Sequence, residues 1–200
     1  MFFYYENRLR KAGYKFIIGI DEAGRGPLAG PVVSAAVWLK KNKFDTLIDD
    51  SKKLSEAQRK KAFFEIKANS ISAVGIVDEK TIDRINILEA TCLSAERAAL
   101  ALLKKLRVDP KKIYFIVDGG IRLDIGFPFL SIIKGDAKSL SIAAASIVAK
   151  VIRDQIMLKY DKLFPLYGFA KHKGYPTQQH REILKKIGPS RIHRLSFSYV

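Results

Sequence analysis

The stretch that decides the fold covers residues 15–30 and reads Lys15-Phe16-Ile17-Ile18-Gly19-Ile20-Asp21-Glu22-Ala23-Gly24-Arg25-Gly26-Pro27-Leu28-Ala29-Gly30. Residues 15–22 are predicted to form a strand, and residues 16–20 within it are apolar on both faces, which places this strand at the centre of a sheet. A second apolar run, residues 32–39, follows after a short connection rich in glycine. Because no helix fits between the two strands, we expect them to pair in antiparallel fashion.

The rest of the chain alternates helices and strands, which is the pattern of an α/β protein. Further strands are predicted at residues 71–77, 113–117 and 129–133. Helices are predicted at residues 56–67, 88–107, 139–160 and 177–187. The first of these follows a capping-box pattern, Ser55 to Gln58. We expect residues 1–164 to form one domain and residues 165–200 to form a small helical extension packed on it.

The long helix at 139–160 has the period of an amphipathic helix. Its expected buried stripe consists of Ala145, Val148, Ala149, Ile152 and Ile156. Its expected polar face consists of Ser139, Ser146, Lys150 and Arg153.

Charge is the first indication of function. The 200 residues include 36 Lys and Arg against 20 Asp and Glu, a formal net charge of +16. Such a field attracts polyanions, above all nucleic acid, although a lysine-rich surface can also serve solubility. Cys92 is the only cysteine, which excludes a disulfide framework. No apolar run approaches the ~20 residues of a membrane span, and the first residues do not resemble a signal peptide, so we expect a cytoplasmic protein without membrane contact.

Four acids stand at the ends of predicted core elements. Asp21 and Glu22 end the first strand, Asp118 ends the fourth, and Asp136 precedes the long helix. Singly, each has a plain structural explanation, such as a turn or a helix N-terminus. Together, clustered carboxylates suit divalent cations, and hard oxygen ligands select Mg²⁺ or Mn²⁺. Two such ions about 4 Å apart can activate water and stabilise the leaving oxygen of a phosphodiester.

Motifs along nearly the whole chain resemble the ribonuclease HII family, the type 2 ribonucleases H. They are GIDEAGRGPLAGPV at 19–32, DSKKL at 50–54, IDRINIL at 82–88, VDG at 117–119, KGDAKS at 134–139, IAAASIVAK at 142–150, HKGYPT at 172–177, and GPS at 188–190 leading to HR at 193–194. Arginine at position 25 favours this family over the similar ribonucleases HIII, which usually carry lysine there.

The resemblance implies a ribonuclease H-like fold, in which helices flank a mixed five-stranded sheet. It also implies an endonuclease that hydrolyses the RNA strand of RNA–DNA hybrids and cuts 5′ to ribonucleotides embedded in duplex DNA. Two Mg²⁺ or Mn²⁺ ions are expected per site, with 3′-hydroxyl and 5′-phosphate products. The implied catalytic and metal-binding acids are Asp21, Glu22, Asp118 and Asp136.

Substrate contacts follow from the same resemblance. The backbone of Gly24, Arg25 and Gly26 is expected to read the 2′-hydroxyl, the group that distinguishes RNA from DNA. Tyr175 is expected to pack on the sugar of the adjoining deoxynucleotide. Phosphate contacts are expected, as an alternative to a solvated face, from Ser51, Lys52, Lys53, Lys138 and Ser139.

Two other functions remain open on the residues alone. A basic module that binds RNA or hybrids without cutting them shares the charge but has no need of four acids. A DNA nuclease or transposase-like domain could use the same acids and ions but would ignore the 2′-hydroxyl. A monomer is the expected state of a chain this compact.

Overall fold

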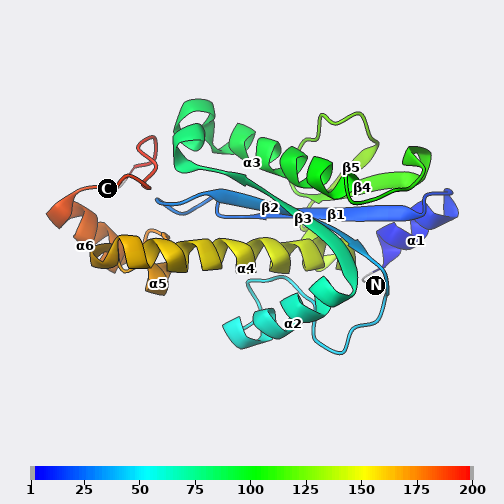
Figure 1. Cartoon of the computed structure of the whole chain (residues 1–200), viewed down its shortest axis with the longest axis horizontal. Helices are drawn as coiled ribbons and strands as arrows, with labels where there is room; N and C mark the ends of the chain where they lie inside the picture. Colours follow the sequence, from blue (N-terminus) through cyan, green and yellow to red (C-terminus); the bar gives the residue numbers. More distant parts are fainter. Residues whose placement is uncertain (1–2, 199–200) are drawn as a thin grey trace.

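The computed structural model describes residues 3–198, with a five-stranded sheet as its middle layer (Figure 1). The strands are β1 (Phe16–Ala23), β2 (Val32–Leu39), β3 (Ser70–Val77), β4 (Ile113–Asp118) and β5 (Phe129–Ile132). Their order is β3-β2-β1-β4-β5, with β1 at the centre. β2 is antiparallel to both β1 and β3, whereas β4 is parallel to both β1 and β5. The predicted mixed sheet and the antiparallel first pair are confirmed.

Helices cover both faces of this sheet (Figure 1). α3 (Glu79–Leu103) lies on one face, and α2 (Glu56–Ala68) and α4 (Leu140–Leu163) lie on the other. α1 (Tyr4–Lys11) lies at one end of the molecule, and α5 (Phe169–His172) and α6 (Gln178–Ile187) lie at the other. Among residues 3–198, no helix is both long and apolar enough to cross a membrane.

Two glycines set how closely the helices approach the sheet. A Cβ on Gly19 of β1 would lie 2.2 Å from the carbonyl carbon of Ser141 in α4. A Cβ on Gly75 of β3 would lie 2.0 Å from the carbonyl oxygen of Ser94 in α3. Neither backbone can move away without disturbing its helix, so both positions require glycine. The close contact of β1 with α4 brings the end of the strand under the helix.

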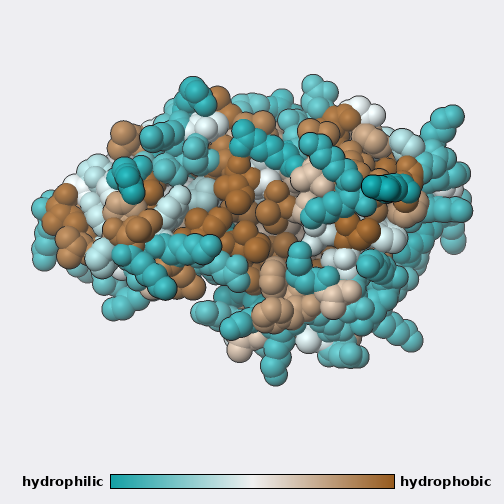
Figure 2. All heavy atoms as spheres, viewed as in Figure 1, coloured by the Kyte–Doolittle hydropathy of each residue, from teal (hydrophilic) through white to brown (hydrophobic). Residues whose placement is uncertain are grey.

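Hydrophobic side chains on the face seen in Figure 2 gather between α3 and α4, over the edge of the sheet. The edge strand there is β3, and its Ile76 is 41% exposed. Hydrophilic side chains cover most of the periphery of this face.

The helices differ most from the sequence expectations at α1 and α3. α1 was not predicted, although its Tyr5 and Leu9 lie four positions apart and pack against the same part of the core. α3 begins at Glu79 rather than at residue 88 and ends at Leu103 rather than at 107. Asn86 interrupts it with a φ of 66°, and the Asn86 side chain accepts hydrogen bonds from the N–H groups of Leu88 and Glu89. The helix therefore restarts at the position that sequence periodicity identifies. The capping box from Ser55 to Gln58 is present as predicted.

The predicted polar face of α4 is wrong for three of its four residues. Arg153 is fully buried, and Ser139 and Ser146 are also buried. The Ser139 hydroxyl caps α4 and donates to the buried Glu6 carboxylate of α1 at 2.7 Å. Of the predicted buried stripe, Ile152 and Ile156 are only half-buried. The reason is that the sheet and the C-terminal segment enclose α4 from different sides, so that polar groups on it are covered.

The segment from residue 165 onward packs against α4 and the loop between β1 and β2. Their shared apolar cluster consists of Leu28, Ala29, Met157, Tyr167, Phe169, Leu184 and Ile192. An isolated antiparallel bridge from Ala29 to His193 adds backbone pairing. A domain boundary at residue 164 stays a prediction. The last two residues of the predicted extension, 199 and 200, lie outside the described residues.

All three histidines of the chain are buried in this segment. His193 Nδ1 accepts from the N–H of Ser190 at 2.9 Å, so the proton of a neutral ring lies on Nε2. That nitrogen lies 3.0 Å from Nε2 of His180, whose own proton must then lie on Nδ1. His180 Nδ1 donates in turn to the carbonyl of Tyr175 at 3.0 Å. A chain of neutral rings thus fixes the backbone of Tyr175.

Titration of the histidines tests this packing. Burial is the main cause that lowers the pKa of His180 and of His193 from 6.5 to about 4. Protons therefore favour the unfolded chain, and the stability that the neutral rings contribute is complete above about pH 6.5 and lost as the pH falls through 4. We expect ring-proton NMR titrations with midpoints near pH 4, and amide exchange that accelerates with acid in residues 165–198 before it does in the sheet. Midpoints near 6.5 with unchanged exchange would contradict the buried chain.

Candidate active site

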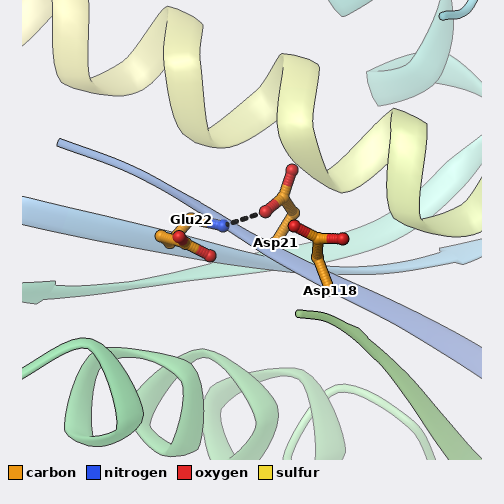
Figure 3. A group of neighbouring side chains, drawn as sticks. All are labelled: Asp21, Glu22 and Asp118. Carbon is orange, nitrogen blue, oxygen red and sulfur yellow. Dashed lines mark hydrogen bonds between the residues drawn. The ribbon is translucent and has the colours of Figure 1, made fainter. Parts of the chain in front are cut away.

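Three acids converge where two parallel strands end. Ile20 of β1 pairs with Val117 of β4, so Asp21 and Asp118 follow side by side at the same edge of the sheet. One carboxylate oxygen from each of Asp21, Glu22 and Asp118 lies within 4.8 Å of the other two (Figure 3). Asp21 points toward α4 and is only 4% exposed, whereas Glu22, the next residue of the strand, is half-buried. The structure thus brings together three of the four predicted acids.

The surroundings of Asp21 disfavour its negative charge. Burial, followed by the charges of Glu22 and Asp118, raises the pKa of Asp21 well above its usual value. The Ser146 hydroxyl and the N–H of Glu22, which donates to Asp21 at 2.7 Å, oppose this rise without cancelling it. A divalent cation is the natural compensation for such a cluster, and an all-carboxylate donor set fits Mg²⁺ or Mn²⁺.

Asp136 lies beside this trio but outside its closest contacts. It belongs to a 3-10 turn, Gly135–Ala137, whose Gly135 N–H donates to the Asp118 carboxylate at 2.5 Å. Burial, then the charges of Asp50 and Asp118, raises the pKa of Asp136. A Cβ on Gly135 would lie 2.7 Å from Ile142 and 3.2 Å from the Asp118 carboxylate. A side chain at this position would therefore crowd Ile142 and the Asp118 carboxylate.

Sequence reasoning did not include Asp50 among the acids. The signal was its position at the start of the DSKKL motif, directly before the three residues Ser51, Lys52 and Lys53 that were expected to contact phosphates. Lys52 of the same motif faces the cluster: burial lowers its pKa, but the charges of four acids outweigh this and raise it. Those acids are Asp50, Asp21, Asp136 and Glu22, in decreasing order of effect.

A groove of about 380 Å³ adjoins the acids. Glu22 of the acid cluster lines it. Its lining also contains six of the predicted substrate-binding residues, namely Gly24, Arg25, Gly26, Ser51, Lys52 and Tyr175. Ser146 and Lys150 of α4 also line it and were not predicted as site residues. The ring of Tyr175 is 38% exposed, and the Lys150 ammonium lies 5.4 Å from its centre. The structure therefore joins segments from four distant parts of the chain into one basic groove beside the carboxylates.

The remaining predicted contacts lie outside this lining. Lys53 is exposed and pairs with Asp49 at 3.2 Å, and Lys138 is exposed. Ser139 is fully buried, with its hydroxyl engaged by Glu6, so it does not present itself to a phosphate.

Known proteins are similar to this chain in sequence and in fold. The family model for ribonuclease HII matches residues 18–200. The chain belongs to the ribonuclease HII family. The ribonuclease HII of Acetivibrio thermocellus is 53% identical over 195 residues, which cover 97% of this chain and 74% of that protein. The ribonuclease HII of Caldicellulosiruptor bescii is 48% identical, and the match covers 98% of this chain and 93% of that protein. The predicted enzyme class, a ribonuclease that hydrolyses phosphodiesters, is thereby confirmed.

A solved structure supports the fold of this ribonuclease HII family member. The ribonuclease H2 of Pyrococcus horikoshii OT3 superposes with a TM-score of 0.73 at 27% identity, covering 92% of this chain and 95% of that one. The ribonuclease H-like fold that the resemblance implied is thereby confirmed.

Replacement of Asp21 tests the electrostatics of the cluster. Asp21→Asn keeps an acceptor for the N–H of Glu22 but removes a charge that the fold disfavours. We expect the melting temperature in EDTA at pH 7 to rise, by about 2–4 °C for each kcal/mol gained in a chain of this size. Added Mn²⁺ should stabilise the unchanged protein more than the variant, because a ligand has been removed.

Asp45→Asn is the matched control, because Asp45 is exposed and distant in sequence from the cluster. It should change stability by no more than about 0.5 kcal/mol and keep the full response to Mn²⁺. A lower melting temperature for Asp21→Asn in EDTA, together with an undiminished response to Mn²⁺, would contradict this account.

Proposed function

We propose that this ribonuclease HII family member is an endonuclease that hydrolyses the RNA strand of RNA–DNA hybrids and cuts duplex DNA 5′ to embedded ribonucleotides. The observation that carries the proposal is the position of the groove, which places the backbone of residues 24–26 and the face of Tyr175 directly beside the acids. A nucleic-acid strand held in it would present a sugar to the loop and a phosphate to the carboxylates.

The proposed catalytic acids are Asp21, Glu22, Asp118 and Asp136, which would hold two Mg²⁺ or Mn²⁺ ions. When bound, such ions activate water and stabilise the leaving oxygen of a phosphodiester. The carboxylates fix where the cations lie, and the Gly135 N–H holds Asp118 in place at 2.5 Å. The bond from phosphorus to the 3′ oxygen breaks while a bond from phosphorus to the water oxygen forms. The products are a 3′-hydroxyl and a 5′-phosphate, and the departing 3′ oxygen takes up a proton.

Some of the proposed substrate contacts would recognise the sugar, and the others would hold the phosphates and so position the duplex. The N–H groups of the 24–26 loop would recognise the 2′-hydroxyl, and Tyr175 would pack on the sugar of the next deoxynucleotide. Lys52 and Ser51 in the groove, and Lys53 and Lys138 outside its lining, would contact phosphates and set the register of the duplex. The charge of +16 favours this association at low salt.

Cleavage of a defined duplex tests the proposal. A labelled DNA duplex with one ribonucleotide should be cut on the 5′ side of that ribonucleotide with Mg²⁺ or Mn²⁺ and left intact in EDTA. Mass spectrometry should find 3′-hydroxyl and 5′-phosphate ends. Asp118→Asn should lose more than about 100-fold in rate, since even groups that only support metal ligands cost 10–100-fold.

Asp124→Asn provides the control, because it makes the same change of charge at an exposed acid only six positions along the chain, and it should cut normally. Binding without products would favour a non-catalytic module. Equal cutting of an all-DNA duplex would favour a DNA nuclease, and activity that survives in EDTA would remove the role of the cations.

A further inference from the structure

The loop between β1 and β2 is held from inside the protein by one arginine. Arg194 is fully buried, and its guanidinium donates to three carbonyl oxygens of this loop. Nη2 lies 2.6 Å from the carbonyl of Gly24, and Nη1 lies 2.9 Å from that of Arg25. Nε and Nη2 both donate to the carbonyl of Gly30, at 2.9 Å and 2.8 Å. All three guanidinium nitrogens are therefore used to hold the two ends of one loop.

These contacts decide where the loop's N–H groups point. In a trans peptide the C=O and the following N–H point in opposite directions, and the described chain has no cis peptide. Since the carbonyls of Gly24 and Arg25 face Arg194, the N–H groups of Arg25 and Gly26 face the opposite side. Both residues line the groove. Within residues 3–198, neither N–H donates to a protein acceptor, so both are available to a ligand.

We propose that Arg194 is a positioning residue for recognition of the ribose: by fixing two carbonyls behind the loop, it aims two N–H groups at the 2′-hydroxyl. This inference rests on the proposed function, and it adds a residue that itself makes no contact with the groove. Its action is on specificity, because the acids that cut the phosphodiester do not depend on these peptide planes.

Lysine cannot replace the arginine in this role. A guanidinium is a rigid planar fork with five donors, whereas an ammonium is a compact charge on a flexible stem. The segment that carries Arg194 is itself held in place. Its N–H donates to the carbonyl of Leu28 at 2.9 Å, and the guanidinium carbon lies 5.1 Å from the centre of the Phe197 ring. Asp83 of α3 accepts from the N–H groups of Leu195 and Ser196, both at 2.9 Å.

Arg153 acts on the same connection but at a different place. It donates to the carbonyls of Ala29 and Pro31, and to that of Lys173 next to the Tyr175 turn. It does not hold the carbonyls of Gly24 or Arg25, so the direction of the two groove-facing N–H groups depends on Arg194.

The test compares affinities for two duplexes that differ in one hydroxyl group. One DNA duplex contains a single ribonucleotide and the other contains the deoxynucleotide at the same position. Binding is measured by fluorescence anisotropy with Mg²⁺ in the Asp118→Asn background, so that neither duplex is cut. We expect Arg194→Lys to reduce the ratio of the two affinities by at least about tenfold, mainly through weaker binding of the ribonucleotide duplex, because two hydrogen bonds to one hydroxyl lose their alignment.

Two further variants keep the result clear if Arg194→Lys folds poorly. Phe197→Ala removes the ring beside the guanidinium at a half-buried position, and it should reduce the ratio in the same direction by about threefold, the smaller effect expected of an indirect contact. Leu102→Ala, at a fully buried position of α3, lowers stability away from the groove and should leave the ratio unchanged.

The outcomes separate this inference from the proposed function. If the protein with Arg194 intact binds both duplexes equally, recognition of the 2′-hydroxyl fails as a whole. If that protein prefers the ribonucleotide and folded Arg194→Lys keeps the full preference, the positioning role is overturned. If Arg194→Lys does not fold, an unchanged ratio in Phe197→Ala overturns the role, and a reduced ratio supports it.

Discussion

The central constraint on the structure is the repulsion between carboxylates that the fold holds close together. β1 and β4 run parallel as neighbours, so the acids that end them, Asp21 and Asp118, cannot separate without breaking the centre of the sheet. Burial under α4 removes the water that would otherwise screen Asp21. In a chain with a net charge of +16, a concentrated negative site has to be built by the fold, and a bound cation would offset the repulsion within it.

The C-terminal segment completes what the sheet begins. Arg194 holds the loop that follows β1, and the histidine chain holds the backbone of Tyr175 on the other side of the groove. The arginine donates to backbone carbonyls, and the neutral histidine rings bond to one another and to a carbonyl. All of these hydrogen bonds lie in the protein interior, where hydrogen bonds are strong and polar groups without a partner are costly. A groove held by such contacts would lose less conformational entropy when a nucleic acid binds.

The residues were enough to predict the strands and the antiparallel first pair, because the strands are short apolar runs, whereas the mixed five-stranded sheet was implied by the family resemblance. Asp21, Glu22, Asp118 and Asp136 were expected together because they stand at the ends of core elements and match the family motifs, and the parallel pairing of β1 with β4 explains why three of them meet. The sequence could not predict that Arg153 is buried, because helical periodicity assigns a charged residue to the surface and takes no account of the segment that covers it. Glu6 was missed for a related reason, because its partners Ser139 and Ser141 lie far away in the sequence, whereas Asp50 acts on its near neighbour Lys52 and on Asp136, which only the fold brings close.

Anomalous scattering from a crystal soaked in Mn²⁺ tests the central claim most directly. The account predicts two strong peaks about 4 Å apart, coordinated by Asp21, Glu22, Asp118 and Asp136. Peaks confined to surface acids such as Asp45 or Asp124, with the cluster empty at a saturating concentration of Mn²⁺, would contradict it.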